Sequence, residues 1–77
     1  MIKEKRRYLR FIGKNIRQYR QLKKMTQKEL AEKVGSSSKY ISRIELGRAN
    51  PSIHLCYLIA NALGTDMYSL YDDDYPF

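Results

Sequence analysis

The chain has few of the residues that build disulfides, metal sites and membrane spans. Among its 77 residues there is one cysteine, Cys56, one histidine, His54, and no tryptophan. A single cysteine excludes an internal disulfide and fits a reducing cytosol, so we expect a cytoplasmic protein. No apolar run is long enough to span a bilayer and no signal-peptide pattern opens the chain, so we expect no membrane association.

Motifs for catalysis and cofactor binding are also missing. Two soft ligands cannot complete a closed zinc site, and His54 and Cys56, two residues apart on a helical segment, point apart. Asp72, Asp73 and Asp74 lack the spacing of a calcium loop and are typical of a solvated tail. No serine has a histidine base placed by motif, and no glycine loop matches a phosphate-binding fingerprint. We therefore expect no enzyme, no metal, no cofactor and no small-molecule ligand.

Positive charge is absent from one end of the chain and concentrated in the rest. Residues 51–77 hold four aspartates and no Lys or Arg, whereas residues 1–50 hold all 15 Lys and Arg residues and four glutamates. The formal charges are therefore +11 and −4, which give the net charge of +7. This distribution is typical of a DNA-binding face with a back that repels DNA, or of a generally basic soluble surface.

The most informative pattern lies between Gln27 and Leu46, where two short amphipathic helical segments follow each other directly. Apolar residues share one face of each segment: Leu30, Ala31 and Val34 in the first, Ile41 and Ile44 in the second. Gly35 lies between them and supplies the left-handed backbone that a tight helix-to-helix turn needs. The small side chain of Ala31 lets the helices cross closely. The order of these features predicts a helix-turn-helix that binds DNA.

Periodicity and capping residues predict five helices and no strand, so the expected fold class is all-α. The expected helices run from about Tyr8 to Lys23, from Thr26 as N-cap to Val34, from Ser36 or Ser37 as N-cap to Glu45, from Ile53 after the cap Ser52 to Leu63, and from Thr65 as N-cap to Tyr71. The core face of the first helix is expected to carry Leu9, Ile12, Ile16 and Tyr19. Residues 1–77 then form one small domain with a basic arm, residues 1–7, and an acidic tail, residues 72–77.

Residues between positions 9 and 71 also match a known family in type and spacing. The match is carried by Ile12-Gly13, Ile16-Arg17, Arg20, Thr26-Gln27, Glu29-Leu30-Ala31, Gly35, Ile41-Ser42-Arg43-Ile44-Glu45, Gly47, Asn50-Pro51-Ser52 and Ala62-Leu63-Gly64. In these residues the chain resembles the Cro/C1-type, or XRE-like, helix-turn-helix domain of phage repressors and small bacterial regulators. The resemblance implies the compact five-helix fold of lambda-repressor-like domains. Ser36 departs from the family, which usually has an apolar residue at this place in the turn.

The third expected helix carries the candidate base-reading residues. If Ile41 and Ile44 face inward, the outward-facing residues are Ser38, Lys39, Ser42 and Arg43. The resemblance implies that Ser38, Lys39 and Arg43 read base edges in the major groove. Lys39 or Arg43 is able to donate to guanine O6 and N7. The alternative for either side chain is a solvated charge or a phosphate contact.

Contacts to the DNA backbone are expected on both sides of that helix. The free N–H groups at the start of the second helix attract an anion, and the family's glutamine, here Gln27, approaches the backbone there. Ser37, Arg48 and Asn50 are the other candidates, although Asn50 is also suited to organising the turn before Pro51. Tyr40 either reaches the DNA, at a phosphate or a thymine methyl, or covers the edge of the core.

Two further groups of charges have separate expected roles. The resemblance implies that Arg20 and Glu45 form a structural ion pair between the first helix and the end of the third. The basic residues near the N-terminus either lie along phosphates or a minor groove, or form a disordered end that only raises general affinity. They are Lys3, Lys5, Arg6, Arg7 and Arg10.

The fourth expected helix is apolar on two sides, which predicts burial on two sides. One stripe is expected to seal the core and consists of Ile53, Cys56, Ala60 and Leu63. The second stripe is expected to pack against another copy of the chain and consists of Leu55, Leu58, Ile59 and Ala62. Because a chain of this length buries only about 60% of its unfolded surface, dimerisation would also stabilise it. The alternative is that the tail folds back over the second stripe.

Together these patterns predict a sequence-specific regulator that binds double-stranded DNA as a homodimer, as a repressor at an inverted-repeat operator. One alternative is an antitoxin-type or adaptor protein that binds a protein partner and autoregulates through the same domain. Another is a basic domain that binds nucleic acid without sequence preference.

Overall fold

The computed structural model describes the backbone of residues 2–71 and the side chains of residues 7–71. Within that range it contains no strand and five helices: α1 (Ile2–Leu22), α2 (Gln27–Val34), α3 (Ser38–Glu45), α4 (Ile53–Ala62) and α5 (Met67–Leu70). The all-α prediction is therefore confirmed. The expected acidic tail, residues 72–77, lies outside the described residues.

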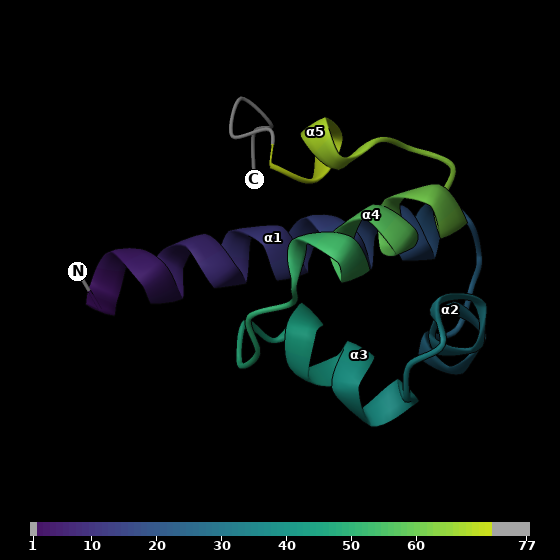
Figure 1. The fold of residues 1–77 in the computed structure, drawn as a ribbon, viewed down its shortest axis with the longest axis horizontal. Coiled ribbons are helices and arrows are strands. Elements are labelled where there is room, and N and C mark those ends of the chain that lie inside the picture. The colour runs from purple at the N-terminus through teal and green to yellow at the C-terminus, as the bar shows by residue number, and fades with distance from the viewer. Residues whose placement is uncertain (1, 72–77) are drawn as a thin grey trace.

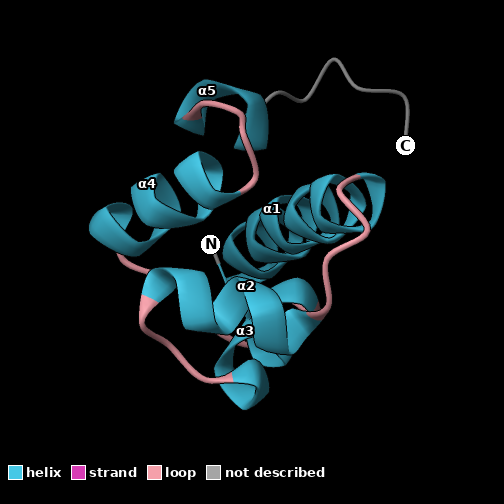
Figure 2. Ribbon diagram, turned by 90° about the vertical axis from the view of Figure 1, so that its right-hand side faces the viewer, coloured by secondary structure: helices cyan, strands magenta, loops and turns pink. Residues whose placement is uncertain are grey.

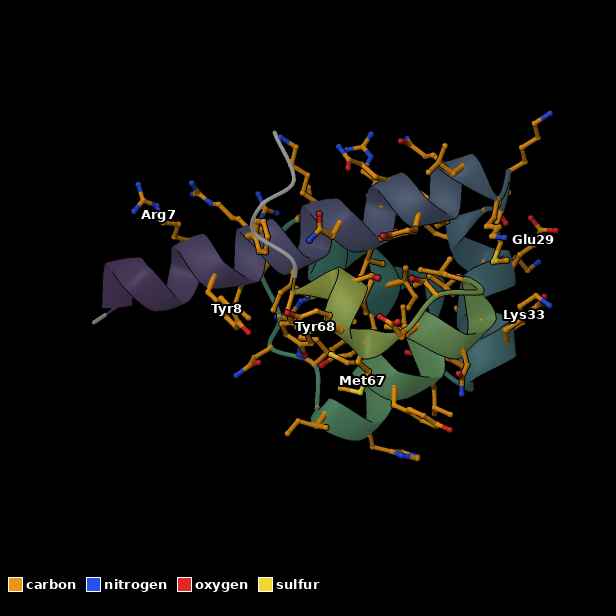
Figure 3. All side chains as sticks on the ribbon, turned by 90° about the horizontal axis from the view of Figure 1, so that it is seen from above. Arg7, Tyr8, Glu29, Lys33, Met67 and Tyr68 are labelled. Atoms are coloured by element: carbon orange, nitrogen blue, oxygen red, sulfur yellow. The ribbon has the colours of Figure 1, made fainter. Side chains whose placement is uncertain are left out.

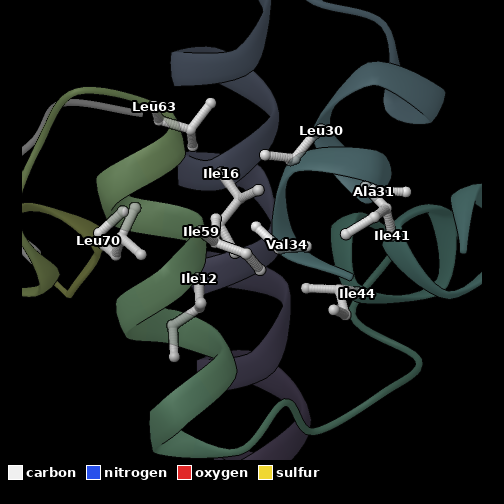
Figure 4. Packing of buried hydrophobic residues seen from close by; sticks show 11 residues of the cluster. Ile12, Ile16, Leu30, Ala31, Val34, Ile41, Ile44, Ile59, Leu63 and Leu70 are labelled. Atoms are coloured by element: carbon white, nitrogen blue, oxygen red, sulfur yellow. The ribbon is translucent and has the colours of Figure 1, made fainter. Parts of the chain in front are cut away.

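The helices form two layers around a single core. α1 and α4 make the upper layer with α5 above them, and α2 and α3 lie below (Figures 1 and 2). Side chains from every helix contribute to this core (Figure 4). The largest fully buried ones are Ile16, Leu30, Ile41, Ile44, Ile59, Leu63, Leu70 and Cys56. Burial of each large aliphatic side chain stabilises the fold by roughly 1.5–3 kcal/mol, so this small set accounts for most of the packing.

The N-terminal start of α1 differs from the prediction. α1 begins at Ile2 rather than near Tyr8, so residues 2–7 continue the helix and do not form a separate basic arm. The physical reason is that residues 2–12 contain neither Gly nor Pro and consist largely of strong helix formers. The helix ends where Lys24 takes a left-handed conformation, with φ 54°.

Caps define the ends of the short helices. The Thr26 hydroxyl accepts from the Glu29 N–H at 3.0 Å, and the Thr26 N–H donates to the Glu29 carboxylate at 2.8 Å, which completes the predicted capping box. The donated hydrogen bond also lowers the pKa of Glu29 below its ordinary value. Ser52 caps α4 as predicted, and of the two expected candidates for the cap of α3, Ser36 and Ser37, it is Ser37 that caps the helix.

The prediction that Thr65 caps α5 is wrong. The carboxylate of Asp66 caps this helix, because it accepts from the Ser69 N–H at 2.9 Å and from the Ser69 hydroxyl at 3.0 Å. The Thr65 N–H donates to the Ala60 carbonyl at 2.9 Å and so closes the end of α4. Thr65 therefore closes the C-terminal end of α4, and the next residue, Asp66, caps the start of α5.

α1 and α5 are joined by a buried polar contact that the sequence analysis did not anticipate. Asn15 is only 3% exposed, and its side-chain amide donates to the Leu70 carbonyl at 2.8 Å. The available signal was an amide on the apolar side of α1, three residues after Ile12 and four before Tyr19. A buried amide at such a position must have a partner, and here it holds the last carbonyl of α5.

The inward face of α4 also differs from the prediction. Ile59, expected at a dimer interface, is fully buried within its own chain, whereas Ile53, expected in the core, is 76% exposed. The buried stripe follows the i, i+3, i+4, i+7 pattern and consists of Cys56, Ile59, Ala60 and Leu63. Leu55, Leu58 and Ala62 lie beside it, partly buried and packed against the core.

Candidate nucleic-acid interface

The turn between α2 and α3 is closed by the backbone. Gly35 takes a left-handed conformation with φ 71°, and the Ser36 N–H donates to the Ala31 carbonyl at 2.8 Å. A Cβ at position 35 would meet no atom within 4 Å, so the glycine is required by its conformation and not by space. The polar residue at position 36 therefore leaves the turn geometry intact.

α3 presents the three expected base-reading residues to solvent. Ile41 and Ile44 are 0% and 1% exposed and face the core, as predicted. Ser38, Lys39 and Arg43 are exposed. Lys39 and Arg43 are four residues apart and so are neighbours on the outer surface of the helix.

The base of α3 is held by a charged network that connects three helices. Arg20 of α1 forms a two-point contact with Glu45, Nε to Oε2 at 2.6 Å and a terminal nitrogen to Oε1 at 3.1 Å. Its other terminal nitrogen donates to the Met25 carbonyl at 2.8 Å. The Arg20 and Glu45 side chains are 12% and 3% exposed, so each charge depends on the other for compensation. The predicted structural pair is confirmed.

Gln27, expected at the DNA backbone, takes part in the same network. Its side-chain amide donates to Oε1 of Glu45 at 3.0 Å. This bond connects the first residue of α2 to the last residue of α3, and the sequence analysis missed it. The signal that was available is the acidic Glu45 on the inner side of α3, which can accept more hydrogen bonds than Arg20 alone supplies.

The other expected backbone-contacting residues lie around the ends of α3. Ser37 is exposed, and its hydroxyl accepts from the Tyr40 N–H at 3.1 Å. Arg48 and Asn50 are exposed in the loop between α3 and α4, and the Arg48 carbonyl accepts a long hydrogen bond of 3.4 Å from Arg43. Tyr40 is half-buried and packs against the core, as one of the two interpretations of this residue predicted.

α1 crosses the C-terminal end of α3 at very short range. A Cβ at Gly13 would lie 2.2 Å from the Ile44 carbonyl oxygen, which leaves no room for any side chain. One turn earlier, Arg10 packs against Gly47, where a Cβ would lie 2.7 Å from the Arg10 Cγ. Gly47 also has a φ of 74°, so a side chain at this position would both contact Arg10 too closely and strain the backbone. These contacts fix α3 relative to α1.

A second surface feature lies away from α3. A groove of about 380 Å³ runs between α1, the loop before α4, and α5, and its lining consists of Tyr8, Ile12, Asn50, Pro51, Ile53, Cys56, Met67 and Tyr71. The Tyr8 and Tyr71 rings stack at 5.9 Å between centroids. Burial raises the pKa of Tyr71 above its ordinary value, and a hydrogen bond with Cys56 adds to the shift.

The described residues form neither a metal cluster nor a membrane-spanning helix. In that part of the chain, no three His, Cys, Asp or Glu side chains gather as a metal site would require. None of the described helices is both long and apolar enough to cross a bilayer.

Comparison with known proteins places this geometry in a family. Residues 16–70 match the helix-turn-helix family model. The chain is 36% identical over 70 residues to the uncharacterized HTH-type transcriptional regulator y4dJ of Sinorhizobium fredii, covering 88% of this chain and 91% of that protein. It is 35% identical over 63 residues to the immunity repressor protein of Bacillus phage phi105, covering 82% of this chain and 44% of that protein.

Two further comparisons extend the range of relatives. The chain is 46% identical over 56 residues to multiprotein-bridging factor 1 of Candida albicans, covering 73% of this chain and 37% of that protein. The crystal structure of the restriction-modification controller protein C.AhdI from Aeromonas hydrophila superposes with a TM-score of 0.82 at 27% identity, covering 86% of this chain and 96% of that one. The chain belongs to the Cro/C1-type (XRE) helix-turn-helix family of DNA-binding transcriptional regulators.

Proposed function

We propose that residues 1–77 act as one domain that binds double-stranded DNA sequence-specifically, as a cytoplasmic homodimer that represses transcription at an inverted-repeat operator. The observation that carries the proposal is the outer face of α3, where Ser38, Lys39 and Arg43 are exposed on a helix held from behind. A recognition helix needs this combination of free side chains and a fixed axis, because misplacement would break hydrogen bonds to base edges. The phage phi105 relative is named as a repressor, which supports the repressor role.

In this proposal Lys39 and Arg43 read base edges and Ser38 assists them. A bidentate contact from either cation to a guanine would contribute about 1–3 kcal/mol of discrimination. The 3.4 Å bond from Arg43 to the Arg48 carbonyl is long and exposed, so it is weak enough to exchange for a base contact.

Backbone contacts come from the two ends of the motif. Gln27 and Ser37 lie at the starts of α2 and α3, whose free N–H groups favour a phosphate. Because its amide nitrogen already donates to Glu45, Gln27 contributes through its backbone N–H and positions α3 at the same time. Arg48 and Asn50 approach phosphates from the loop after α3. Tyr40 contributes at most its hydroxyl, because its ring packs on the core.

The homodimer needs a surface that leaves both α3 helices facing one side of the DNA. Half-sites one helical turn apart lie ~34–36 Å from each other. The long dimension of the molecule, 33 Å, is close to this separation, so two copies arranged end to end along it would have the spacing of successive half-sites. Two surfaces are available on α4.

The first surface is the partly buried set Leu55, Leu58 and Ala62, which retains the interface role expected from the sequence, without Ile59. The second, the groove patch, consists of large apolar side chains exposed on the helices that border the groove. Tyr8 and Ile53, 51% and 76% exposed, line the groove itself, and Tyr57 and Tyr68, 51% and 84% exposed, directly follow the lining residues Cys56 and Met67 in the sequence. We favour the groove patch, because large apolar side chains exposed together usually mark an interface.

Selection of bound duplexes from random DNA tests the central proposal. The enriched sequence is expected to be an inverted repeat bound by two protomers, with the stoichiometry measured by sedimentation. A single asymmetric site occupied by one protomer would contradict the homodimer. Enrichment of no sequence would contradict specific binding and favour a non-specific basic domain.

A second candidate function is an adaptor that binds a protein partner through the groove patch. The similarity to multiprotein-bridging factor 1 favours it, and an open apolar groove is a suitable surface for a partner segment. The oligomeric state of the purified chain distinguishes the two functions. A stable homodimer that buries the groove patch supports the regulator, whereas a monomer that leaves the groove patch open to a partner segment supports the adaptor.

A further inference from the structure

The continuous α1 carries a basic stripe along one side. Its described members are Arg7, Arg10, Lys14 and Arg17, all exposed. At 100° per residue these positions fall within an arc of about 80°. No Asp or Glu lies on this arc between positions 7 and 21. Arg7 belongs to the stripe because α1 begins at Ile2, so a helix that began at Tyr8 would not include it.

The composition of the stripe is unfavourable for the isolated helix. Like charges three or four residues apart on a helix repel each other, and three spacings of this kind occur between Arg7 and Arg17. The salt bridge between Arg20 and Glu45 lies on another side of α1. An anionic partner would turn this repulsion into attraction.

The stripe is continuous with the DNA-facing side of the molecule. Arg10 packs against Gly47, directly beside Arg48 in the loop after α3. α1 continues beyond this loop toward its N-terminus, as Figure 1 shows. In Figure 3, Arg7 and Tyr8 point away from opposite sides of this overhang, so the basic side is separate from the apolar groove.

We propose that Arg7 and Arg10 form a second phosphate-binding surface, which contacts the DNA backbone flanking the half-site that α3 reads. The inference rests on the proposed function and adds to it a contact outside the helix-turn-helix. From Gly13, which touches α3, the axis of α1 advances about 9 Å to Arg7. Successive phosphates of one strand are spaced about 3.4 Å along the DNA axis, so a helix that lies along this axis spans about three base pairs between its contact with α3 and Arg7.

The test compares two duplexes that carry the selected sequence, one trimmed to its edges and one with ten added base pairs on each side. The wild-type chain is expected to bind the flanked duplex more tightly. The variant Arg7→Gln/Arg10→Gln is expected to lose this gain, and the slope of log affinity against log salt is expected to fall by about 1.8, for two phosphates. Glutamine keeps the Cγ of Arg10 that packs on Gly47, so the fold is retained.

The matched control is Lys23→Gln/Lys33→Gln, which removes the same charge from exposed positions. Lys23 lies beside Gly64, and Lys33 lies at the opposite end of the molecule from Arg7 (Figure 3). The control is expected to keep the gain from flanking DNA. The inference would be overturned if the wild type and the double arginine variant had the same affinities for both duplexes. The single variant Arg7→Gln repeats the test without changing Arg10, which packs against Gly47. A wild-type chain that prefers no sequence would instead overturn the proposed function.

Discussion

Gly13 is the residue on which the placement of α3 most depends. Its Cβ-free backbone allows α1 to approach the carbonyls of Ile44 and Glu45, where any added carbon would lie within 3 Å of both oxygens. Alanine would gain about 1 kcal/mol of helix propensity, but overpacking against rigid backbone outweighs this gain. The close crossing therefore requires glycine at this position.

We expect Gly13→Ala to lower the free energy of unfolding by about 1–3 kcal/mol and to weaken DNA binding, because α3 must move away. Urea unfolding monitored by circular dichroism measures the change. Gly35→Ala is the matched control: it meets no neighbour, so only the strain of its positive φ remains, about 1 kcal/mol. If Gly13→Ala were no more destabilising than Gly35→Ala, the close-contact explanation would be wrong.

Glu45 is the second residue whose role can be measured directly. Its carboxylate accepts from both Arg20 and Gln27, and its side chain is 3% exposed. Glu45→Ala would leave the Arg20 guanidinium almost buried without its partner, and we expect a loss of about 3–5 kcal/mol.

The double variant Arg20→Met/Glu45→Leu separates charge pairing from packing. Because both charges are removed, we expect it to recover most of the stability lost in Glu45→Ala, as measured by thermal unfolding. DNA affinity should not recover equally, since Gln27 has lost its acceptor. If the double variant were as unstable as Glu45→Ala, the Arg20–Glu45 pair would stabilise the fold by more than the neutralisation of each buried charge by the other.

At the scale of elements, α5 depends on its neighbours. A helix of four residues does not form alone, because nucleation is costly. Leu70 anchors it in the core, and the Asn15 amide satisfies its last carbonyl. α5 in turn carries the exposed Tyr68 and, through Met67, lines the groove.

We therefore expect Asn15→Ala to loosen α5 selectively. The unpaired Leu70 carbonyl costs about 1–3 kcal/mol, and this cost falls on the element with the fewest other contacts. Hydrogen exchange should show faster exchange at Ser69 to Tyr71 with little change in α2 and α3. Asn61→Ala, at an exposed asparagine of α4, is the control and should leave α5 protected. Uniform acceleration across the chain would argue against a local role.

The elements also show how far the sequence alone predicts this molecule. Capping boxes and serine caps involve residues three positions apart, so Thr26 and Ser52 were predicted correctly, and the cap of α3 was narrowed to Ser36 or Ser37. The Arg20–Glu45 pair spans 25 positions and came from the family resemblance, which carries tertiary information that spacing does not.

The remaining errors have physical causes. In α4 only His54 and Asn61 are polar, so the periodicity lacks the contrast that would identify Ile59 as buried and Ile53 as exposed. The bond from Asn15 to Leu70 spans 55 positions and depends on how α5 folds back. The start of α1 lies in a charged segment where no glycine, proline or cap marks a boundary.

At the scale of the whole molecule, three surfaces serve different purposes. The outer face of α3 faces the DNA, the basic stripe of α1 adjoins it, and the groove patch lies around α4 and α5. The separation matters because a regulator bound to adjacent half-sites must contact DNA and a second copy at the same time. Each surface can therefore be altered without removing a core side chain.

The last prediction identifies which surface joins the two copies. We expect Tyr68→Glu/Ile53→Glu to keep the helical content but to dissociate the dimer, because two charges enter an apolar contact with little penalty to the monomer. Sedimentation and circular dichroism measure both properties. Affinity for the full inverted repeat should fall steeply while affinity for one half-site is kept. Leu58→Glu is the comparison: if it dissociates the dimer while the first variant does not, the Leu55, Leu58 and Ala62 surface is the interface. An unfolded Leu58→Glu monomer would show that this leucine serves the core beside Ile59, which leaves the exposed tyrosine and isoleucine as the surface available to a second copy.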